Sequence, residues 1–317
     1  MKKKKFSFFL ILRLLGIVIF IVILTRVDLG RIFEVLRDIS IYPFLLAILF
    51  QVLLLLFKGI RWHIMNDGRA HRMYWIRTFG RFFESYAIGV VTPGRLGEMM
   101  KAGHEKEKSD KVNALIRVIS ERGFDISIFV LVAVMALFFG HSLEMESGFK
   151  YLFLLIGLAL GVVSYLLLSS RKILALLQKI LHRISKKSSS IIIKGKQYRK
   201  GTVALILLLS VLSNYSYFIS CYYLAQSVGL PLGLVDTGAG VAVAGLVNML
   251  PVTVMGLGTR ELIFLSIFNA YAESTVLAFS FAIFLVAQIG GGLISMILGQ
   301  VFLIMDRNHI RKSEIQN

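Results

Sequence analysis

The chain has 317 residues, of which 56% are hydrophobic, with a mean hydropathy of +0.76 and a formal net charge of +18. Soluble domains balance apolar and polar residues more evenly, and several apolar runs here are long enough to cross a hydrocarbon core. The composition therefore excludes a soluble globular protein, and the continuity of the runs excludes a membrane β-barrel, whose strands alternate. The sequence predicts an all-α, polytopic helical membrane protein with about six full spans and two re-entrant or broken helix pairs.

The basic residues gather in loops between the apolar runs. In a soluble protein this charge would suggest nucleic acid, but here it predicts topology and contact with the anionic inner leaflet, with no nucleic-acid partner. The single cysteine, Cys221, excludes an intrachain disulfide, and no Cys/His cluster has metal-ligand spacing. We therefore expect no metal and no cofactor.

Six apolar runs are predicted to be full spans: 6–25, 41–60, 123–140, 151–169, 202–226 and 275–304. The first follows Lys2 to Lys5 and resembles a signal peptide, but it lacks a small-residue cleavage site. It is predicted to be retained as a span. The few polar residues of later apolar stretches, Asn214, Asn248 and Gln288, are expected to hydrogen-bond between helices.

Loop charges predict a multi-pass protein of the plasma (inner) membrane with both termini in the cytoplasm. Residues 26–40 are expected to form an amphipathic helix at the outer face, and the acidic loop 141–150 is expected outside. Lys58 and Arg61 are assigned to a cytoplasmic loop by the same rule. Residues 1–317 are predicted to form one membrane domain, divided into a first half (1–170), a basic cytoplasmic linker (171–200), a second half (201–306) and a cytoplasmic tail (307–317).

Two further apolar stretches, 74–110 and 236–272, are interrupted by proline and glycine. The predicted breaks lie at Pro93, Gly94, Gly97, Pro251, Gly256 and Gly258. If residues 82–93 crossed the membrane, the basic stretch 101–122 would lie outside, so a re-entrant pair that turns and returns is favoured. For the C-terminus to lie in the cytoplasm, the second stretch must cross the membrane an even number of times. A re-entrant pair or two short full spans would both satisfy this condition. Paired breaks of this kind are typical of transporter binding sites and suggest an inverted repeat around a wet cavity.

Arg260 is the only basic residue between Gly201 and Asp306, and Glu261 follows it directly. A charge at bilayer depth is costly unless it is paired or wet. At the start of a half-helix, Arg260 and the free N–H groups would make an anion site suited to phosphate. The alternative is that the two charges neutralise each other and hold the loop, although neighbours on a helix do not face each other. The sequence leaves both open.

A second charged cluster is predicted at the cytoplasmic side: Arg95, Glu98 and Lys101, then Glu121, Arg122 and Asp125. Glu121 and Asp125 are four residues apart on one helix face, where like charges repel unless a cation lies between them. Arg95 or Arg122 could supply that cation. The alternatives are an ordinary interfacial ion-pair network and a binding site, and the second is favoured.

These segments resemble a known family. The stretches "TPGRLGEMMKAG", "VISERGFDISIFVLVAV" and "LPVTVMGLGTRELIFLSIF", with "KGIRWHIM", are similar to the signature regions of the lysylphosphatidylglycerol synthase transmembrane-region family, also called flippase-like or UPF0104 proteins. The resemblance implies that the membrane domain flips aminoacylated phosphatidylglycerol made by a separate soluble domain. Because the chain ends at Asn317, we expect no acyltransferase domain within it.

The expected function is translocation of a phospholipid or polyprenyl-phosphate lipid, whose head group lies in a cavity between the broken helices. The predicted substrate-binding residues are Arg95, Glu98, Glu121, Arg122, Asp125, Arg260 and Glu261. No P-loop is present, so transport would be downhill or ion-coupled, and a separate lipid-modifying enzyme is an expected partner. The alternatives are the membrane part of a phosphatidylglycerol lysyltransferase, a polyprenyl-phosphate glycosyltransferase and a non-transporting scaffold. No catalytic residue is predicted.

Overall fold

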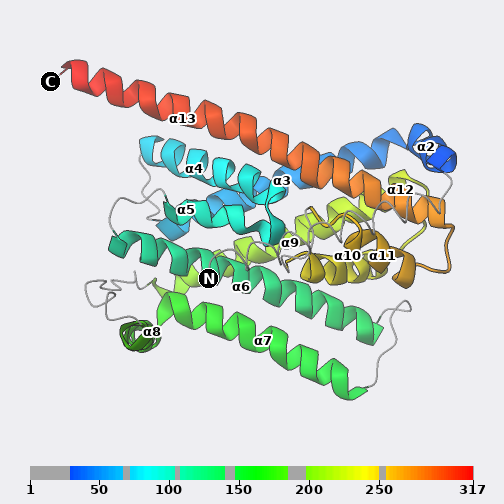
Figure 1. Cartoon of the computed structure of the whole chain (residues 1–317), viewed down its shortest axis with the longest axis horizontal. Helices are drawn as coiled ribbons and strands as arrows, with labels where there is room; N and C mark the ends of the chain where they lie inside the picture. Colours follow the sequence, from blue (N-terminus) through cyan, green and yellow to red (C-terminus); the bar gives the residue numbers. More distant parts are fainter. Residues whose placement is uncertain are drawn as a thin grey trace, which may run out of the picture.

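The computed structural model describes residues 29–66, 72–103, 108–139, 147–184, 198–249 and 255–316, and these form helices with no strand among them (Figure 1). The first half contains α2 (Leu29–Arg37), α3 (Ile41–Asn66), α4 (Arg72–Val91), the 3-10 helix η1 (Pro93–Met99), α5 (Met100–Gly103), α6 (Lys108–Phe139) and α7 (Ser147–Ser169). The rest comprises α8 (Arg171–Ile184), α9 (Lys200–Ser227), α10 (Leu234–Met249), α11 (Thr259–Ile267), α12 (Glu273–Ile283), the π-helix η3 (Phe284–Gly290) and α13 (Gly291–Gln316).

The prediction of an all-α polytopic membrane protein is confirmed. Four helical stretches of the described chain are long and apolar enough to cross a membrane: Ile41–Asn66, Lys150–Ser169, Lys200–Ser227 and Glu273–Asp306. They contain or closely match four of the predicted spans. The predicted span 123–140 falls mostly within α6, and the predicted span 6–25 lies outside the described residues.

Helices from the two halves of the sequence pack against one another. The long helix α3 contacts α9, α13 contacts α4, and α10 contacts α6, which also contacts α7. The π-helix η3 continues α12 into α13, so the hydrogen-bond register changes within the last span. Such π segments often occur at functional sites.

The helices of the two broken segments lie in opposite halves of the bundle (Figure 1). Helix α4 starts at the end where α8 and the C-terminus lie, and η1 and α5 return toward that end. Helices α10 and α11 occupy the opposite half. Because α11 has nine residues, about 14 Å at 1.5 Å per residue, it is too short to cross a core of about 30 Å. This favours re-entrant pairs over short full spans.

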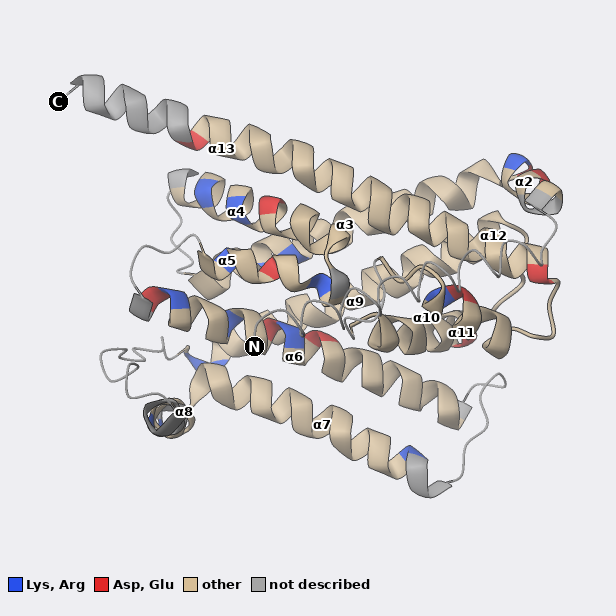
Figure 2. Ribbon diagram, in the orientation of Figure 1, with Lys and Arg blue, Asp and Glu red and all other residues tan. Residues whose placement is uncertain are grey.

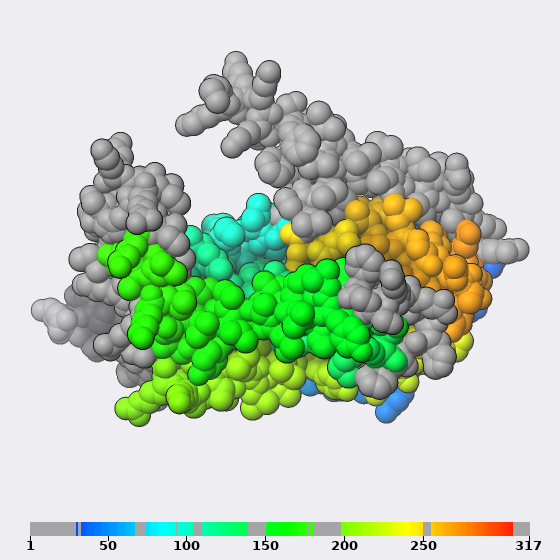
Figure 3. Space-filling model, turned by 90° about the horizontal axis from the view of Figure 1, so that it is seen from below, coloured from blue at the N-terminus to red at the C-terminus, as the bar shows by residue number. Residues whose placement is uncertain are grey.

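Two short helices lie at opposite ends of the bundle and run across its long direction (Figure 1). One is α2, where an amphipathic helix was expected outside, and the other is α8, in the predicted cytoplasmic linker. Apolar side chains of α7 are largely exposed: Tyr151, Leu152, Phe153, Leu155, Ile156, Leu158, Val162 and Val163. Figure 3 shows α7 on one long face beside part of α9, as expected for a face that contacts lipid acyl chains.

Candidate functional site

The break after α4 is built from left-handed backbone. Gly94 has φ 58° and Arg95 has φ 54°, a region that non-glycine residues rarely adopt. The Thr92 hydroxyl accepts a hydrogen bond from the Gly97 amide at 2.7 Å and so closes the turn. Strained residues of this kind concentrate at binding and catalytic sites. The strain at Arg95 therefore marks this turn as a candidate site.

Glycine residues permit the η1 segment, which returns after the break, to lie against α4. A Cβ atom at Gly97 would lie 2.6 Å from the carbonyl carbon of Ile88, and one at Gly89 would lie 2.5 Å from Cγ of Glu98. A larger residue at Gly97 would meet backbone atoms, and one at Gly89 would displace the Glu98 side chain. The close approach buries Glu98, whose side chain is 5% exposed, within the bundle.

Glu98 is the centre of one group of buried ion pairs. Its carboxylate contacts Nζ of Lys101 at 3.4 Å and Nη1 of Arg95 at 3.7 Å, and it also pairs with Arg122 of α6. Lys101 reaches Glu121 at 3.0 Å and so joins the hairpin to α6. Figure 2 shows acidic and basic positions along the η1–α5 segment and on α6. The side chains of Glu98, Lys101 and Glu121 are at most 5% exposed.

The cation between Glu121 and Asp125 is Arg61 of α3, not Arg95 or Arg122 as expected. Its guanidinium lies 2.6 Å from Glu121 and 2.8 Å from Asp125, and its side chain is fully buried. Lys58 contacts Asp125 at 2.9 Å. The assignment of Lys58 and Arg61 to a cytoplasmic loop is therefore wrong. Helix α3 continues past the predicted end of its span, and the carboxylates of α6 compensate the two buried charges.

The network contains more positive than negative side chains. Its five cations are Lys58, Arg61, Arg95, Lys101 and Arg122, and its three carboxylates are Glu98, Glu121 and Asp125. Among the described residues of the network, two positive charges are in excess. Burying an uncompensated charge is costly, so an anion is the ligand that this environment would stabilise.

A polar cavity of about 80 Å³ opens beside the network. The residues that line it include Lys58, Tyr86, Arg95, Arg122, Asp125, Asn214, Asn248 and Gln288. Since one water needs about 10–15 Å³ of such volume, the cavity can hold several waters or a small anionic group. Gln51, also in the lining, has a buried side-chain oxygen without a hydrogen-bond partner among the described residues.

An apolar groove of about 460 Å³ adjoins the polar cavity. It lies between α4 and the η3–α13 segment, and Gln288 of the π-helix lines both spaces. Its lining is mostly aliphatic, with Ile88, Val90, Ile289, Leu293 and Met296 among its residues. The site thus combines a cationic polar cavity with an apolar groove alongside it.

Arg260 and Glu261 form a separate buried group. Nη2 of Arg260 lies 2.8 Å from Glu261, and the hydroxyl of Ser280 accepts from Arg260 and donates to Glu261. Glu261 also accepts from the amide of Gly258 at 2.7 Å. The expectation that these neighbours do not face each other is wrong, because the Glu261 side chain turns back over the helix start. Neither residue is among those lining the polar cavity.

The structure thus joins five of the seven predicted site residues, Arg95, Glu98, Glu121, Arg122 and Asp125, in one network. Sequence analysis did not assign Lys58 and Arg61 to the site. Lys58 and Arg61 are three residues apart in an apolar stretch that continues past them, so they lie on one face of a helix. This spacing could have indicated that both belong to the site. Gly256 and Gly258 both adopt positive φ at the second break, whereas Pro251 lies outside the described residues. No described group of His, Cys, Asp and Glu is arranged to hold a metal ion.

The fold and the site define a multi-pass helical membrane protein with two opposed broken helix pairs and a buried charged cavity. The model of the lysylphosphatidylglycerol synthase TM region family matches residues 9–295, and the chain belongs to that family. Membership places the chain among membrane proteins of lipid metabolism or transport. Comparison with curated protein sequences gives no significant match.

Proposed function

We propose that this chain moves a phosphate-bearing membrane lipid, a phospholipid or a polyprenyl phosphate, between the two leaflets. The observation that carries the proposal is the buried network with five cations and three carboxylates around a polar cavity. A phosphate would supply the missing negative charge. Arginine is suited to this contact because its planar fork can donate two hydrogen bonds to phosphate oxygens.

Arg95 and Arg122 are the residues best placed to meet the phosphate. Both line the polar cavity, and their side chains are 27% and 20% exposed, whereas Arg61 is fully buried between carboxylates. Arg61 and Lys58 then fix the position of Asp125, which lines the cavity, and the two partly exposed arginines bind the phosphate. Glu98, which pairs with both arginines, fixes their positions before a ligand arrives.

The adjoining apolar groove supports a lipid rather than a soluble phosphate compound. Its aliphatic lining between α4 and α13 would accept an acyl or prenyl chain while the head group occupies the polar cavity. Gln288 lies at the junction of the two spaces. The cavity is flanked by re-entrant helices that lie in opposite halves of the bundle. Movement of one broken pair would open the cavity to one leaflet and movement of the other pair to the opposite leaflet, as in transporters with inverted repeats.

The test is a translocation assay with the protein in vesicles that contain a phospholipid with a fluorescent head group. Purified wild-type protein is expected to make the inner-leaflet label accessible to a membrane-impermeant quencher. Arg95→Gln should lower the rate about tenfold or more, since it removes a charge-assisted contact of about 1.5–3 kcal/mol. Arg95→Lys keeps the charge but loses the two-pronged guanidinium geometry. Its translocation rate should lie between those of the wild type and Arg95→Gln.

Arg199→Gln is the matched control, because Arg199 is exposed at the start of α9. It should leave the rate unchanged, and the thermal midpoint of every variant should be measured beside the rate. If wild-type vesicles move the lipid no faster than protein-free vesicles, the scaffold alternative replaces this proposal.

A further inference from the structure

A second polar pocket, separate from the central cavity, lies at the end of the bundle where α4 begins. Its volume is about 180 Å³, and its lining residues include Trp62, Asn66, Arg77, Thr78, Arg81 and Lys101. We infer that this pocket binds a phosphate group, from a lipid head group or from a free phosphate compound. It shares no described lining residue with the central cavity.

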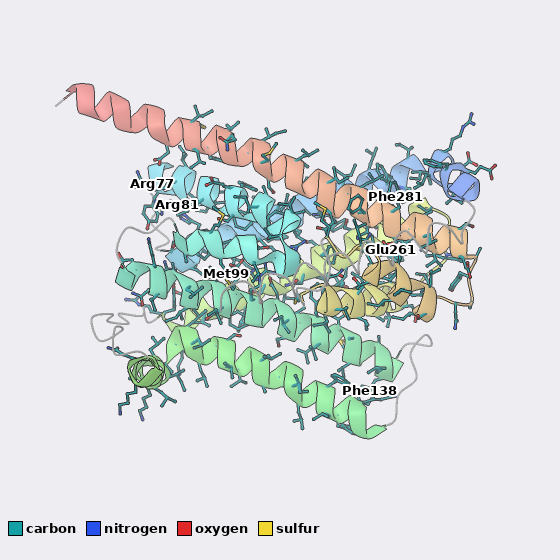
Figure 4. All side chains as sticks on the ribbon, viewed as in Figure 1. Arg77, Arg81, Met99, Phe138, Glu261 and Phe281 are labelled. Carbon is teal, nitrogen blue, oxygen red and sulfur yellow. The ribbon has the colours of Figure 1, made fainter. Side chains whose placement is uncertain are left out.

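The charges that line the pocket favour an anion. Three of the described lining residues are cations, Arg77, Arg81 and Lys101, and none is a carboxylate. Arg77 donates to Asp306 of α13 through Nε and Nη2, at 3.1 and 3.3 Å, which leaves Nη1 outside these two bonds. Figure 4 labels Arg77 and Arg81 on α4, at the end of the bundle predicted to be cytoplasmic.

An unpartnered buried donor gives independent support. The side chain of Trp62 is 2% exposed, and its indole N–H has no acceptor among the described residues. A buried donor without a partner costs about 1–3 kcal/mol, and here it belongs to a residue that lines the pocket. Lys101 lies 5.0 Å from the centre of the Trp62 ring, which places a cation and the indole together at the pocket.

Lys101 stands between this pocket and the central network. It lines the pocket and also pairs with Glu98 and Glu121, which belong to the central site. A phosphate held here would therefore lie on the predicted cytoplasmic side of the buried ion pairs. The inference does not depend on translocation, because it concerns binding alone.

Tryptophan fluorescence can report on this pocket, because the chain has two tryptophans, Trp62 and Trp75, and both lie at its end of the bundle. Purified full-length protein in a neutral detergent is titrated with sodium phosphate in one arm. Dihexanoyl phosphatidic acid is the probe in the other arm, and sodium chloride keeps the ionic strength constant in both. At least one probe should give saturable binding to the wild type.

Two variants locate the binding. Arg77→Gln should weaken it about tenfold or more, the loss expected for one charge-assisted hydrogen bond. Trp62→Phe removes the indole N–H and should also weaken it, with Trp75 left as the reporter. Exposed Arg199→Gln should bind as the wild type does.

The two arms distinguish the sources of phosphate. Saturation by the lipid probe alone assigns the pocket to a head group, and saturation by inorganic phosphate shows that the phosphate suffices. Absence of binding by both probes overturns the inference, as does unchanged affinity in folded Arg77→Gln. Because the titration measures binding and the vesicle assay measures movement between leaflets, failure of one proposal is distinguishable from failure of the other.

Discussion

Arg61 of α3 and Asp125 of α6 form a two-point ion pair inside the bundle. Nη1 and Oδ1 are 2.8 Å apart, and Nη2 and Oδ2 are 3.3 Å apart. The same carboxylate accepts from Lys58 at 2.9 Å and from the amide of Asn214 in α9 at 2.9 Å. One acidic side chain thereby joins three helices that are far apart in the sequence, and the pairing fixes their positions at the depth of the polar cavity.

Asp125→Asn should be strongly destabilising. Removing one partner of a buried pair costs about 3–5 kcal/mol, because the remaining charge stays buried, and here Lys58 would lose its carboxylate while Arg61 would keep only Glu121. A clear fall in the thermal midpoint of the detergent-solubilised protein is expected. Asp110→Asn, at an exposed position in the first turn of α6, is the control and should leave the midpoint unchanged. Equal midpoints for the two variants would mean that the pair contributes no net stability.

Gly97→Ala should disrupt the first hairpin. The new Cβ would lie within 2.6–2.8 Å of the backbone of Ile88 and Gly89, and backbone atoms cannot turn away as a flexible side chain can. We expect a lower thermal midpoint and a lower translocation rate, because Arg95 and Glu98 are positioned by this contact. Gly103→Ala is matched to it, since a Cβ there meets nothing within 4 Å. If both alanine variants behave alike, close approach of the arms does not hold the site.

Variants of Arg260 and Glu261 distinguish a structural role of this pair from a role in binding lipid. Arg260→Gln alone leaves the buried Glu261 without its cation and should lower stability, whereas Arg260→Gln with Glu261→Gln leaves no unpaired charge. The double variant is therefore expected to regain the thermal midpoint. Normal translocation by it would assign the pair to holding the second break, and lost translocation at normal stability would assign Arg260 to the lipid.

The membrane orientation is tested by cysteine labelling in a Cys221→Ser background. Glu34 of α2 and Lys172 of α8 are exposed and lie at opposite ends of the bundle. Glu34→Cys should react with an impermeant reagent added to intact cells, and Lys172→Cys should react only after the cells are opened. The reverse pattern would contradict the predicted orientation.

The elements that depend on length and apolarity were predictable from the sequence. Four predicted spans correspond to helical stretches long and apolar enough to cross a membrane. Gly94 and Gly97 lie within the short kinked helix η1, and Gly256 and Gly258 lie just before α11. These features are local, because a glycine at positive φ or an uninterrupted apolar run acts within a few residues.

The partners within the site could not be predicted in the same way. Charge counting assigned Lys58 and Arg61 to a loop, since the positive-inside rule treats every cation as a surface marker. Their burial depends on carboxylates more than 60 residues away, on α6. Likewise, helical periodicity argued against a contact between Arg260 and Glu261, whereas Ser280 of α12 completes that group. Long-range contacts of this kind are fixed by helix packing.

Lipid binding in the polar cavity is tested most directly by a structure of the wild-type protein in lipid nanodiscs that contain phosphatidylglycerol. We expect head-group phosphate density in the polar cavity, within hydrogen-bonding distance of Arg95 or Arg122, and chain density in the groove lined by Val90 and Leu293. The same density should be absent from Arg95→Gln prepared identically. A wild-type cavity that holds only ordered water, with lipid confined to the outer surface of the bundle, would contradict it.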